Sequence, residues 1–433
     1  MGSVALPKLK ALRWWIIGLV MLGAIVNYLT RSTMGVAAPT ILKDLDISVK
    51  EYSWITSAFQ IGIMMQPFCG YVLDTLGLRT GFAVFAAAWS LVAMAHGLAN
   101  NWQGFAVLRG LLGLAEGSAQ PAGMKTVATW FPAKERGFAG GVFNIGSSIG
   151  SMLAPPLVVW AVLSWNWRAA FVLTGAIGLV WVALWLFFYR SPDQHPSMTP
   201  EERERIAAGQ EAHLTDAGTK PSIVSILKQK QFWGIALPRF LADPTWGTLS
   251  FWVPLYLSQT RGFDLKQIAM FAWLPFVAAD LGCMFGPVIA HFLQKRGVSL
   301  INARRWAVTV GAAMMTGMAF VGRVESPYAA IALLCLGGFA HQTLSVTVIT
   351  MASDLFRRDE VATVAGLAGM MGNLGVLLFS LLIGGLVSTI GYDPFFVALG
   401  VLDILGAIIL WTFVKDRIAP RARPDRLEES RAG

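Results

Sequence analysis

Asn27-Tyr28-Leu29-Thr30-Arg31-Ser32-Thr33 is a polar stretch inside a segment that is otherwise apolar from residue 14 to residue 38. The guanidinium group of Arg31 does not lose its charge, and a charge at bilayer depth costs roughly 3 kcal/mol or more. The nearest carboxylates along the chain, Asp44 and Asp46, lie past the predicted membrane face. We therefore expect Arg31 to point into the protein and to meet an anion that another helix or a ligand supplies.

The composition of the whole chain indicates an integral membrane protein. Of its 433 residues 55% are hydrophobic and only 14% are charged, and the mean hydropathy is +0.58; soluble globular domains are less apolar and carry more charge. Apolar runs of about 18 residues or more are long enough to cross a hydrocarbon core as helices. Twelve such runs occur, at residues 14–38, 53–73, 81–99, 102–126, 137–161, 168–189, 232–258, 266–292, 306–322, 327–353, 361–387 and 394–414. The predicted fold class is an all-α membrane protein with twelve transmembrane helices.

Cysteine usage argues against a protein held by disulfides or zinc, and the N-terminal leader argues against a cleaved secretory signal. Cys69, Cys283 and Cys335 lie in three different apolar runs, and an odd number without CxxC spacing predicts neither a disulfide framework nor a zinc site. The basic leader imitates a secretory signal, but the first span is too long and has no small-residue cleavage site. We expect this span to remain in the mature protein, and we expect no bound metal.

The distribution of Lys and Arg predicts the orientation in the membrane. With the N-terminus inside, 24 of the 34 basic residues fall on cytoplasmic segments. Four fall within spans, and six fall on outside loops, namely Lys43, Lys50, Arg168, Arg261, Lys266 and Arg323. Both termini are then cytoplasmic. Because this topology accounts for the net charge of +9, a nucleic-acid partner is not predicted.

A repeat divides the chain into two halves. The longest polar interval, residues 190–231, separates six spans from six, and its stretch 199–205 is typical of a capped amphipathic surface helix. Shifting the chain by 225 residues aligns Gly113 with Gly338, Ala115 with Ala340, Phe131 with Phe356, Glu135 with Glu360, Gly141 with Gly366 and Gly150 with Gly375. Parallel repeats of this kind place a site between the halves at mid-depth. We predict two pseudo-symmetric six-helix bundles, residues 1–189 and 232–433, with a cytoplasmic linker at 190–231 and a cytoplasmic tail.

The loop after the second span carries the first family signature. Residues 70–79, GYVLDTLGLR, resemble the GxxxDxxGxR loop of the major facilitator superfamily. The resemblance implies that Asp74 caps a neighbouring helix and that Arg79 closes a cytoplasmic charge network, which breaks when the halves rock. The counterpart after the eighth span has Ala290 where the acid would be, so we expect a one-sided gate. The alternative is that Asp74 and Arg79 are solvated turn residues.

Further motifs narrow the resemblance. The stretch NYLTR (27–31) with AAP (37–39), Arg109, Glu116 and WFPAKER (130–136) resembles the anion:cation symporter family. Five longer runs resemble bacterial hexuronate transporters in particular, and the resemblance covers nearly all of residues 10–415. These runs are residues 66–74, NIGSSIGSMLAPPLVVW (144–160), FWGIALPRFLADPTW (232–246), IAMFAWLPFVAADLGC (268–283) and GGFAHQ (337–342).

The resemblance implies a function for the chain. It implies proton-coupled uptake of glucuronate or galacturonate by alternating access in a bacterial inner membrane, without a cofactor other than the coupled proton. The expected partners are a sugar-acid anion, protons and the lipid bilayer, and we expect a monomer. Many sugar-acid members of the family place Asp before the first-span Arg, whereas this chain has Thr30, so their coupling chemistry does not transfer whole. An aldonate such as galactonate, or a dicarboxylate, is the alternative substrate.

Two arginines in different halves are the candidates for binding a carboxylate. Arg31 is on the first span and Arg239 on the seventh, and both helices line the central cavity in this fold. Together they can hold one carboxylate from both sides. For Arg31 the alternative is a structural ion pair. For Arg239 the alternative is a pair with Asp243, four residues along the same helix, where Pro244 disturbs the backbone.

Glu116 is the leading candidate for the proton carrier. Arg109 and Glu116 are seven residues apart, so they share a helix face at about 10 Å along the axis. This separation is too long for a simple ion pair, so a bridge between them requires water, substrate or a third side chain. A carboxylate in such a position can be switched by protonation. The alternative is a static charge in the packing.

The remaining candidates supply polar contacts or further proton sites. Under the 225-residue shift Glu116 aligns with His341, which either binds sugar hydroxyls with Gln342, titrates, or makes a satisfied contact between helices. Asp280 is a rival proton site, and Asp403, on a helix that is usually peripheral, is predicted to be structural. Four residues are predicted to contact the sugar, with simple packing as the alternative: Tyr28 and Trp246 by stacking, and Ser147 and Asn373 through hydroxyl hydrogen bonds.

The chain lacks the sequence features that other functional classes of membrane protein require. A membrane-embedded enzyme would require a catalytic constellation, and the chain contains no HExxH, GxSxG or clustered His set. A multidrug exporter of the same fold would bind cations and would favour acids over arginines in its cavity. A uniporter would lack a titratable group at mid-depth, which Glu116 supplies. The sequence therefore predicts a transporter of an anion rather than an enzyme.

Overall fold

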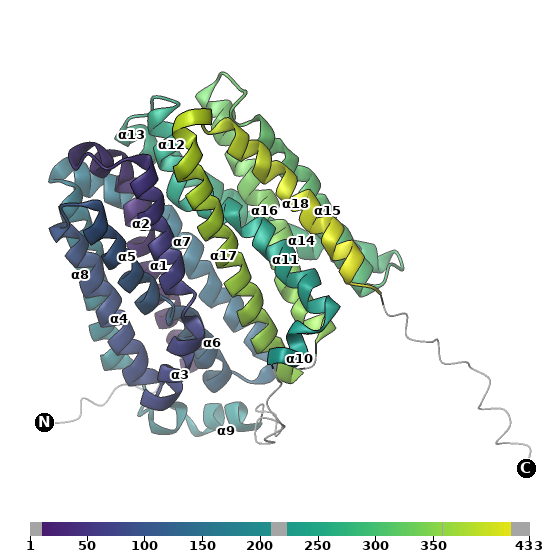
Figure 1. Cartoon of the computed structure of the whole chain (residues 1–433). Helices are drawn as coiled ribbons and strands as arrows, with labels where there is room; N and C mark the ends of the chain where they lie inside the picture. The colour runs from purple at the N-terminus through teal and green to yellow at the C-terminus, as the bar shows by residue number, and fades with distance from the viewer. Residues whose placement is uncertain (1–10, 209–222, 357, 417–433) are drawn as a thin grey trace, which may run out of the picture.

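The computed structural model describes residues 11–208, 223–356 and 358–416. Within these ranges the chain is built from helices and contains no strand. Figure 1 shows the helices as one elongated bundle, with the ends of the described chain at its lower edge. We call this lower edge the α9 end and the opposite edge the α13 end, after the helices that lie there.

Eight of the predicted spans are formed by helices that are long and apolar enough to cross a membrane. Their length and their high mean hydropathy agree with the expectation from the apolar runs. They are α1 (Leu12–Asp44), α4 (Leu78–Ala95), α7 (Ala133–Ser164), α8 (Trp167–Phe188), α13 with α14 (Leu265–Phe271 and Leu274–Lys295), α16 (Pro327–Leu355), α17 (Arg358–Ile390) and α18 (Asp393–Phe413).

The other four spans consist of shorter helical pieces in sequence. They are α2 with α3 (Val49–Ile63 and Gln66–Leu76), α5 with α6 (Trp102–Glu116 and Ala119–Trp130), α11, η4 and α12 (Lys230–Gly247, Thr248–Trp252 and Val253–Gln259), and α15 with η5 (Leu300–Met315 and Thr316–Phe320). A π turn, η4, lies between Pro244 of α11 and Pro254 of α12, and a proline has no backbone N–H to continue the regular helical hydrogen bonds. Each predicted span is thus helical, and the prediction of a twelve-helix, all-α membrane protein is confirmed.

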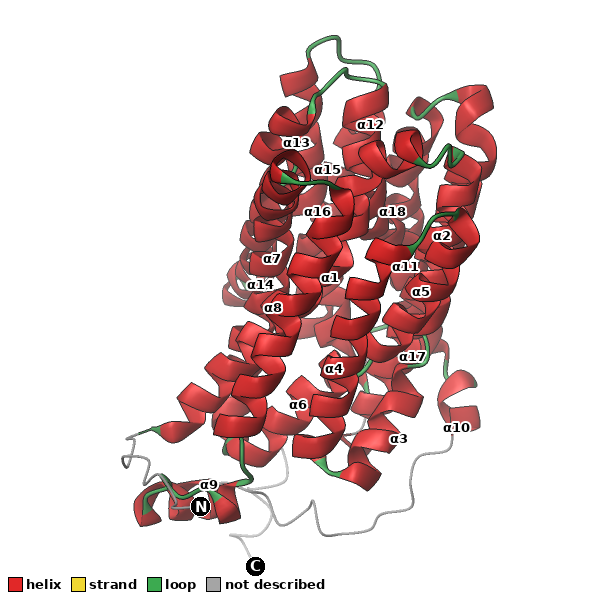
Figure 2. Cartoon of the chain, turned by 90° about the vertical axis from the view of Figure 1, so that its left-hand side faces the viewer, coloured by secondary structure: helices red, strands yellow, loops and turns green. Residues whose placement is uncertain are grey.

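The short helices α9 and α10, in the interval between the two groups of spans, lie at the α9 end of the bundle. Helix α9 (Pro200–Ala208) begins after Thr199, whose hydroxyl accepts the backbone N–H of Glu202 at 3.3 Å. Figures 1 and 2 show α9 lying across the end of the bundle. The short helix α10 (Ile223–Leu227) packs against α11 and α17. The predicted surface helix at 199–205 is therefore present.

Helices pack mainly with members of their own half. In the first half the largest contacts join α1 with α7, α2 with α5, and α4 with α8. In the second half they join α14 with α16, α11 with α17, and α15 with α16. Figure 1 shows the first group in purple to blue and the second in teal to yellow, standing side by side. The predicted residue boundaries of the two bundles and the linker remain a prediction.

The two halves meet chiefly toward the α13 end. Helix α2 packs along α17, and the Tyr52 hydroxyl donates to the carbonyl of Phe251 at 2.6 Å. Thr56 and Ser380 share a hydrogen bond of 2.7 Å, and Gly384 lies so close to Ser53 that a Cβ would clash. Helices α3 and α6, at the α9 end, pack within the first half and make no comparable contact with the second half in the described ranges. The halves are therefore closed against each other on one side.

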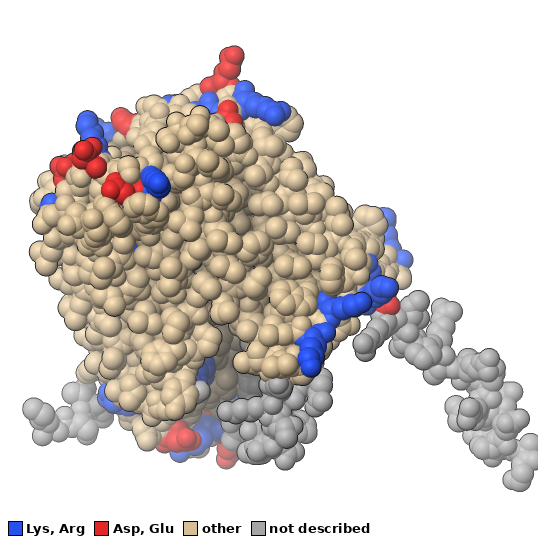
Figure 3. All heavy atoms as spheres, viewed as in Figure 1, with Lys and Arg blue, Asp and Glu red and all other residues tan. Residues whose placement is uncertain are grey.

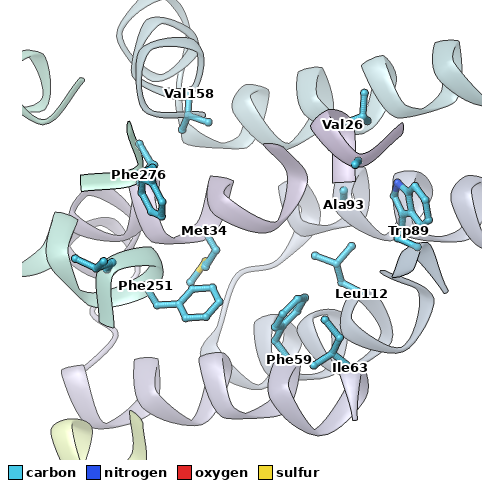
Figure 4. Close-up of a cluster of buried hydrophobic side chains, with 14 of the residues drawn as sticks. Val26, Met34, Phe59, Ile63, Trp89, Ala93, Leu112, Val158, Phe251 and Phe276 are labelled. Atoms are coloured by element: carbon cyan, nitrogen blue, oxygen red, sulfur yellow. The ribbon is translucent and has the colours of Figure 1, made fainter. Parts of the chain in front are cut away.

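The surface and the core follow the pattern of a membrane bundle. In Figure 3 the charged side chains gather at the two ends, and a broad uncharged band separates them. Figure 4 shows apolar side chains between the helices, including Met34, Phe59 and Phe251. Phe59 and Phe251 come from different halves, and their ring centroids are 6.0 Å apart. The apolar core thus extends across the interface next to the charged residues of α1 and α5.

Candidate functional site

The anion that Arg31 requires is Glu116, on α5. Arg31 Nε donates to Glu116 Oε2 at 3.0 Å, and the Thr30 hydroxyl donates to Glu116 Oε1 at 2.9 Å. Both carboxylate oxygens therefore have a donor from α1. The side chain of Glu116 is 0% exposed, whereas that of Arg31 is 15% exposed. The arginine thus remains accessible to a ligand while its protein partner is enclosed.

Aromatic and amide groups orient the Arg31 guanidinium. Its central carbon lies 4.3 Å from the ring centroid of Tyr28 and 5.2 Å from that of Phe59. Arg31 Nη2 also donates to the side-chain oxygen of Asn27 at 3.2 Å, one helical turn earlier. Cation–π contacts of this kind strengthen when water is excluded. The predicted sugar-stacking residue Tyr28 is therefore in contact with the arginine itself.

A close approach of α2 and α5 places Gly113, one turn before Glu116, against Phe59. Gly113 lies against the backbone carbonyl of Phe59, and Gly62 lies against the carbonyl of Gly110, so a Cβ at either glycine would clash. The helix axes can come this near because glycine has no side chain at either position. Helix α5 ends at Glu116, and Gly117 follows before α6 begins. The carboxylate is thus presented at a break in the fourth span.

Arg109 has a different partner from the one its helix suggests. It is 1% exposed, and both of its terminal nitrogens donate to the carbonyl oxygen of Arg31 at 3.2 Å. Its guanidinium carbon lies 5.5 Å from the ring centroid of Phe59. The described structure records no ion pair between Arg109 and Glu116, in keeping with their spacing along the helix. Arg109 therefore ties α5 to the backbone of α1 at the residue that pairs with Glu116.

In the second half Arg239 forms an ion pair with Asp243 of the same helix. This pair was the alternative to ligand binding that the sequence left open for Arg239. Its Nη2 and Nε lie 2.6 Å and 3.2 Å from Asp243 Oδ2. The carboxylate of Asp243 sits over Gly372 of α17, where no side chain would fit. The two side chains are 16% and 13% exposed. Both ends of this pair are therefore partly accessible.

The structure brings His341 and Trp246 together next to this pair. Their ring centroids are 6.0 Å apart with an interplanar angle of 24°, so the rings stack. His341 is 2% exposed, and its Nδ1 has no hydrogen-bond partner among the described residues. Gln342 follows it on α16 and is half-buried. Trp246 thus contacts a protein ring in this conformation.

The other predicted contact residues bond to their own helices. Asn373 Nδ2 donates to the carbonyl of Gly369 at 3.0 Å, and the Ser147 hydroxyl donates to the carbonyl of Asn144 at 2.7 Å. Asp280 instead accepts a hydrogen bond from Ser148, which joins α14 to α7 across the two halves. Of these three residues, Asp280 is thus the one that links the halves.

The structure describes only part of the predicted gate, the loop at residues 70–79 with Asp74 and Arg79. The side chain of Asp74 lies outside the described residues. Arg79 Nη2 donates to the carbonyl of Leu186 on α8 at 2.6 Å. The predicted charge network at this loop therefore stays a prediction.

One charged cluster at the α9 end was missed by the sequence interpretation. Glu202 of α9 accepts the backbone N–H groups of Leu12 and Arg13 at 2.9 and 3.1 Å, so it caps the start of α1. The Arg13 side chain donates to Glu202 and to Glu135, each at 2.9 Å, and Arg205 donates to Glu135 at 2.6 Å. Partial burial alone would raise the pKa of Glu135, but the hydrogen bonds from the two arginines outweigh it and lower the pKa below the ordinary value.

The sequence contained only an indirect indication of this charged cluster. Glu135 belongs to a quoted family motif, whereas Arg13 was counted only as part of the basic leader. Partners separated by 122 and 189 residues share no helical periodicity. Only the packed structure shows that the surface helix caps the first span.

Comparison with known proteins decides the family. The profile of the Major Facilitator Superfamily matches residues 20–324 and 299–433. The chain belongs to the Major Facilitator Superfamily. This membership confirms the predicted family and the prediction of a membrane-spanning transporter rather than an enzyme.

Within the Major Facilitator Superfamily, two relatives match closely. A hexuronate transporter of Escherichia coli K12 is 49% identical over 415 residues, covering 95% of this chain and 96% of the relative. A galacturonate transporter of Dickeya chrysanthemi is 50% identical over 328 residues, covering 75% and 95%. The crystal structure of a bacterial homolog to the human lysosomal transporter Spinster matches with a TM-score of 0.76 at 16% identity, covering 95% of this chain and 100% of that one. The last comparison supports the superfamily fold.

Proposed function

We propose that the chain is a proton-coupled symporter that imports a hexuronate, glucuronate or galacturonate, by alternating access across a bacterial inner membrane. The observation that carries the proposal is the partly exposed Arg31, whose acidic partner Glu116 is enclosed in the protein. The identity with relatives named as transporters of hexuronate and galacturonate supports the substrate class. We expect the protein to act as a monomer with both termini in the cytoplasm, so that the α9 end faces the cytoplasm.

Binding of the substrate carboxylate competes with Glu116 for Arg31. In the described conformation Glu116 takes one hydrogen bond from Arg31 and one from Thr30. Protonation of Glu116 removes its charge and weakens its hold on the guanidinium. Arg31 is then free to bind the carboxylate of the sugar acid as a planar fork. A proton on Glu116 therefore raises the affinity for substrate, and by reciprocity substrate raises the affinity for the proton.

The second half supplies the opposite side of the site. Arg239 is 16% exposed and lies on the first cavity-lining helix of its half, as Arg31 does in the other. Arg109 holds the carbonyl of Arg31 and keeps α1 and α5 together while the pair changes partner. His341, Gln342, Trp246, Asn373, Ser147 and Tyr28 remain the proposed contacts to the sugar. A carboxylate between two arginines from different halves draws the halves together.

Alternating access requires the contacts at the α13 end to open. These contacts include the hydrogen bonds of Tyr52 with Phe251 and of Thr56 with Ser380. With the α9 end in the cytoplasm, the described conformation is closed toward the outside. Asp74 and Arg79 are the proposed gate on the cytoplasmic side, and Asp280, which is joined to Ser148 across the halves, is a rival proton site.

Uptake into proteoliposomes with an imposed pH gradient tests the proposal. Glucuronate, galacturonate, galactonate and lactate are compared side by side, with a protonophore as the control. We expect accumulation of a hexuronate that collapses with the protonophore, and no competition by the neutral sugar alcohol, because it has no carboxylate to draw Arg31 and Arg239 away from Glu116 and Asp243. Preferential uptake of galactonate would favour the aldonate alternative. Strong inhibition by the uncharged sugar would contradict binding between the arginines.

A further inference from the structure

Asp403 of α18 is buried without a partner. The residue is 1% exposed, and neither carboxyl oxygen has a hydrogen-bond partner among the described residues. An ionised carboxylate in such surroundings costs several kcal/mol or changes its protonation state instead. Enclosure without a partner therefore favours the neutral form of Asp403 over the ionised form. A purely structural role, as expected from the sequence, does not explain why an acid occupies a position where it bonds to nothing.

The charged groups that face Asp403 come from α11. Gly406, one turn along α18, lies against the backbone of Pro238, with 3.4 Å between the position of a Cβ and the Pro238 Cα. The Arg239–Asp243 pair follows in α11, and the charge of Asp243 acts on Asp403. Two acids, Asp243 and Asp403, thus lie near one cation, Arg239.

The other elements around α18 place no acid or free cation against Asp403 in the described ranges. On α15 and η5 the neighbours are apolar, since Gly400 lies against Met315 and Ala319. Farther toward the α9 end, Arg305 of α15 donates to the carbonyl of Trp411 and to Asn302. Helix α17 contributes Gly372, over which Asp243 sits. The pair on α11 is therefore the source of charge that reaches Asp403.

A second buried group next to the same pair has one ring nitrogen that is unpartnered in the described ranges, although the ring also bonds to the backbone of Ala242. Arg239 and Asp243 act electrostatically on His341, whose Nδ1 is unpartnered at 2% exposure. One ion pair is thus flanked by two enclosed titratable side chains. When Arg239 turns to a substrate carboxylate, Asp243 loses its counter-charge, and a proton taken from a neighbouring acid is the way to neutralise it.

We propose that Asp403 is a second proton carrier of the transport cycle, which exchanges its proton with Asp243 as Arg239 changes partner between Asp243 and the substrate. This inference rests on the proposed symport of a hexuronate. When Arg239 binds substrate, the proton moves from the Asp403 carboxyl to the Asp243 carboxylate, and Asp403 takes up a replacement proton from the outer side, so that both acids are neutral while substrate is bound. Asp243 and Glu116 each release one proton on the cytoplasmic side as Arg239 and Arg31 return to them. One hexuronate anion then enters with two protons, and each cycle moves one net positive charge inward.

The test measures how membrane potential and a pH gradient drive uptake separately. With equal pH on both sides, an interior-negative potential of about 59 mV should raise the accumulation of glucuronate by wild-type protein tenfold, as one charge requires. Asp403→Asn, which mimics the neutral acid, should lose this response while it keeps uptake driven by a pH gradient and keeps counterflow. Asp403→Glu should retain the potential response. Asp393→Asn, at the start of the same helix, is the matched control and should behave as wild type.

Each outcome decides either this inference or the proposed function. Wild-type uptake that follows the pH gradient but ignores the potential overturns the second carrier and leaves the symport intact. A potential response that persists in Asp403→Asn moves the second proton elsewhere, for example to His341. Loss of folding or of counterflow in Asp403→Asn also overturns the inference, because the amide mimics the neutral acid that the enclosed position favours. Failure of the wild type to accumulate any sugar acid would instead overturn the proposed function.

Discussion

The two central ion pairs are built differently. Arg31 and Glu116 are 85 residues apart and join α1 to α5, whereas Arg239 and Asp243 lie one turn apart on α11. Glu116 is completely enclosed and Asp243 is 13% exposed. A pair between helices depends on where those helices stand, but a pair within one helix survives their movement. The first half is therefore the part in which a change of charge is expected to change the packing.

The largest effect is expected from removal of the Arg31 charge. Arg31→Gln leaves Glu116 enclosed without a cation, and breaking a buried pair in this way costs about 3–5 kcal/mol. We expect a large drop in the thermal midpoint of the purified protein and loss of uptake. Adding Glu116→Gln should restore most of the stability, since no buried charge then remains.

Arg31→Lys is the matched control for charge. An ammonium keeps the charge but replaces the planar fork with a point charge, so substrate should bind poorly while stability falls less than in Arg31→Gln. Hexuronate affinity near that of the wild type in Arg31→Lys would remove Arg31 from the binding site.

A smaller effect is expected in the second half. Arg239→Gln should cost about 1.5 kcal/mol, the lower end of the range for hydrogen bonds to a charged group, because Asp243 keeps contact with solvent. Chemical or thermal unfolding of both glutamine variants in the same detergent measures the difference. A loss in Arg239→Gln that equals the loss in Arg31→Gln would contradict the distinction between the two pairs.

Glu116→Gln separates binding from coupling. The amide mimics the protonated acid, so we expect exchange of labelled for unlabelled hexuronate to continue. The part of the pH-driven accumulation that the Glu116 proton supplies should disappear; for each pH unit this is up to a tenfold loss, about 1.4 kcal/mol. Gradient-driven accumulation at the wild-type level would place the proton elsewhere, with Asp280 as the first residue to examine.

The smallest effect concerns the Glu135 cluster at the α9 end of the first half. Its partly exposed ion pairs with Arg13 and Arg205 are worth about 0.5 kcal/mol. The folded-state pKa of Glu135 lies below its ordinary value of 4.5, so the stabilisation is fully present above that pH and is lost as the pH falls through the lowered pKa. The thermal midpoints of wild type and Glu135→Gln should therefore differ at pH 7 and converge below about pH 4. A difference that grows on acidification would contradict the assigned sign.

The sequence by itself determined the membrane class, the twelve spans and the need of Arg31 for an anion. These follow from local properties, because a helix in a bilayer must be apolar over its length and a charge within it must be compensated. The seven-residue spacing also excluded a simple pair between Arg109 and Glu116, and four-residue spacing allowed the pair of Arg239 with Asp243. Local periodicity therefore predicted which contacts within one helix are possible.

Only the tertiary structure decided which partners are chosen between helices. Glu116 rather than a ligand meets Arg31, Thr30 bonds to the same carboxylate, and Arg109 turns to a backbone carbonyl. Glu202 caps α1 from 190 residues away, and Asp403 is enclosed without a partner although its helix was expected to be peripheral. The physical reason is that burial makes a counter-charge or a proton obligatory but does not name the group that supplies it. That choice depends on which helix faces approach each other when the whole chain packs.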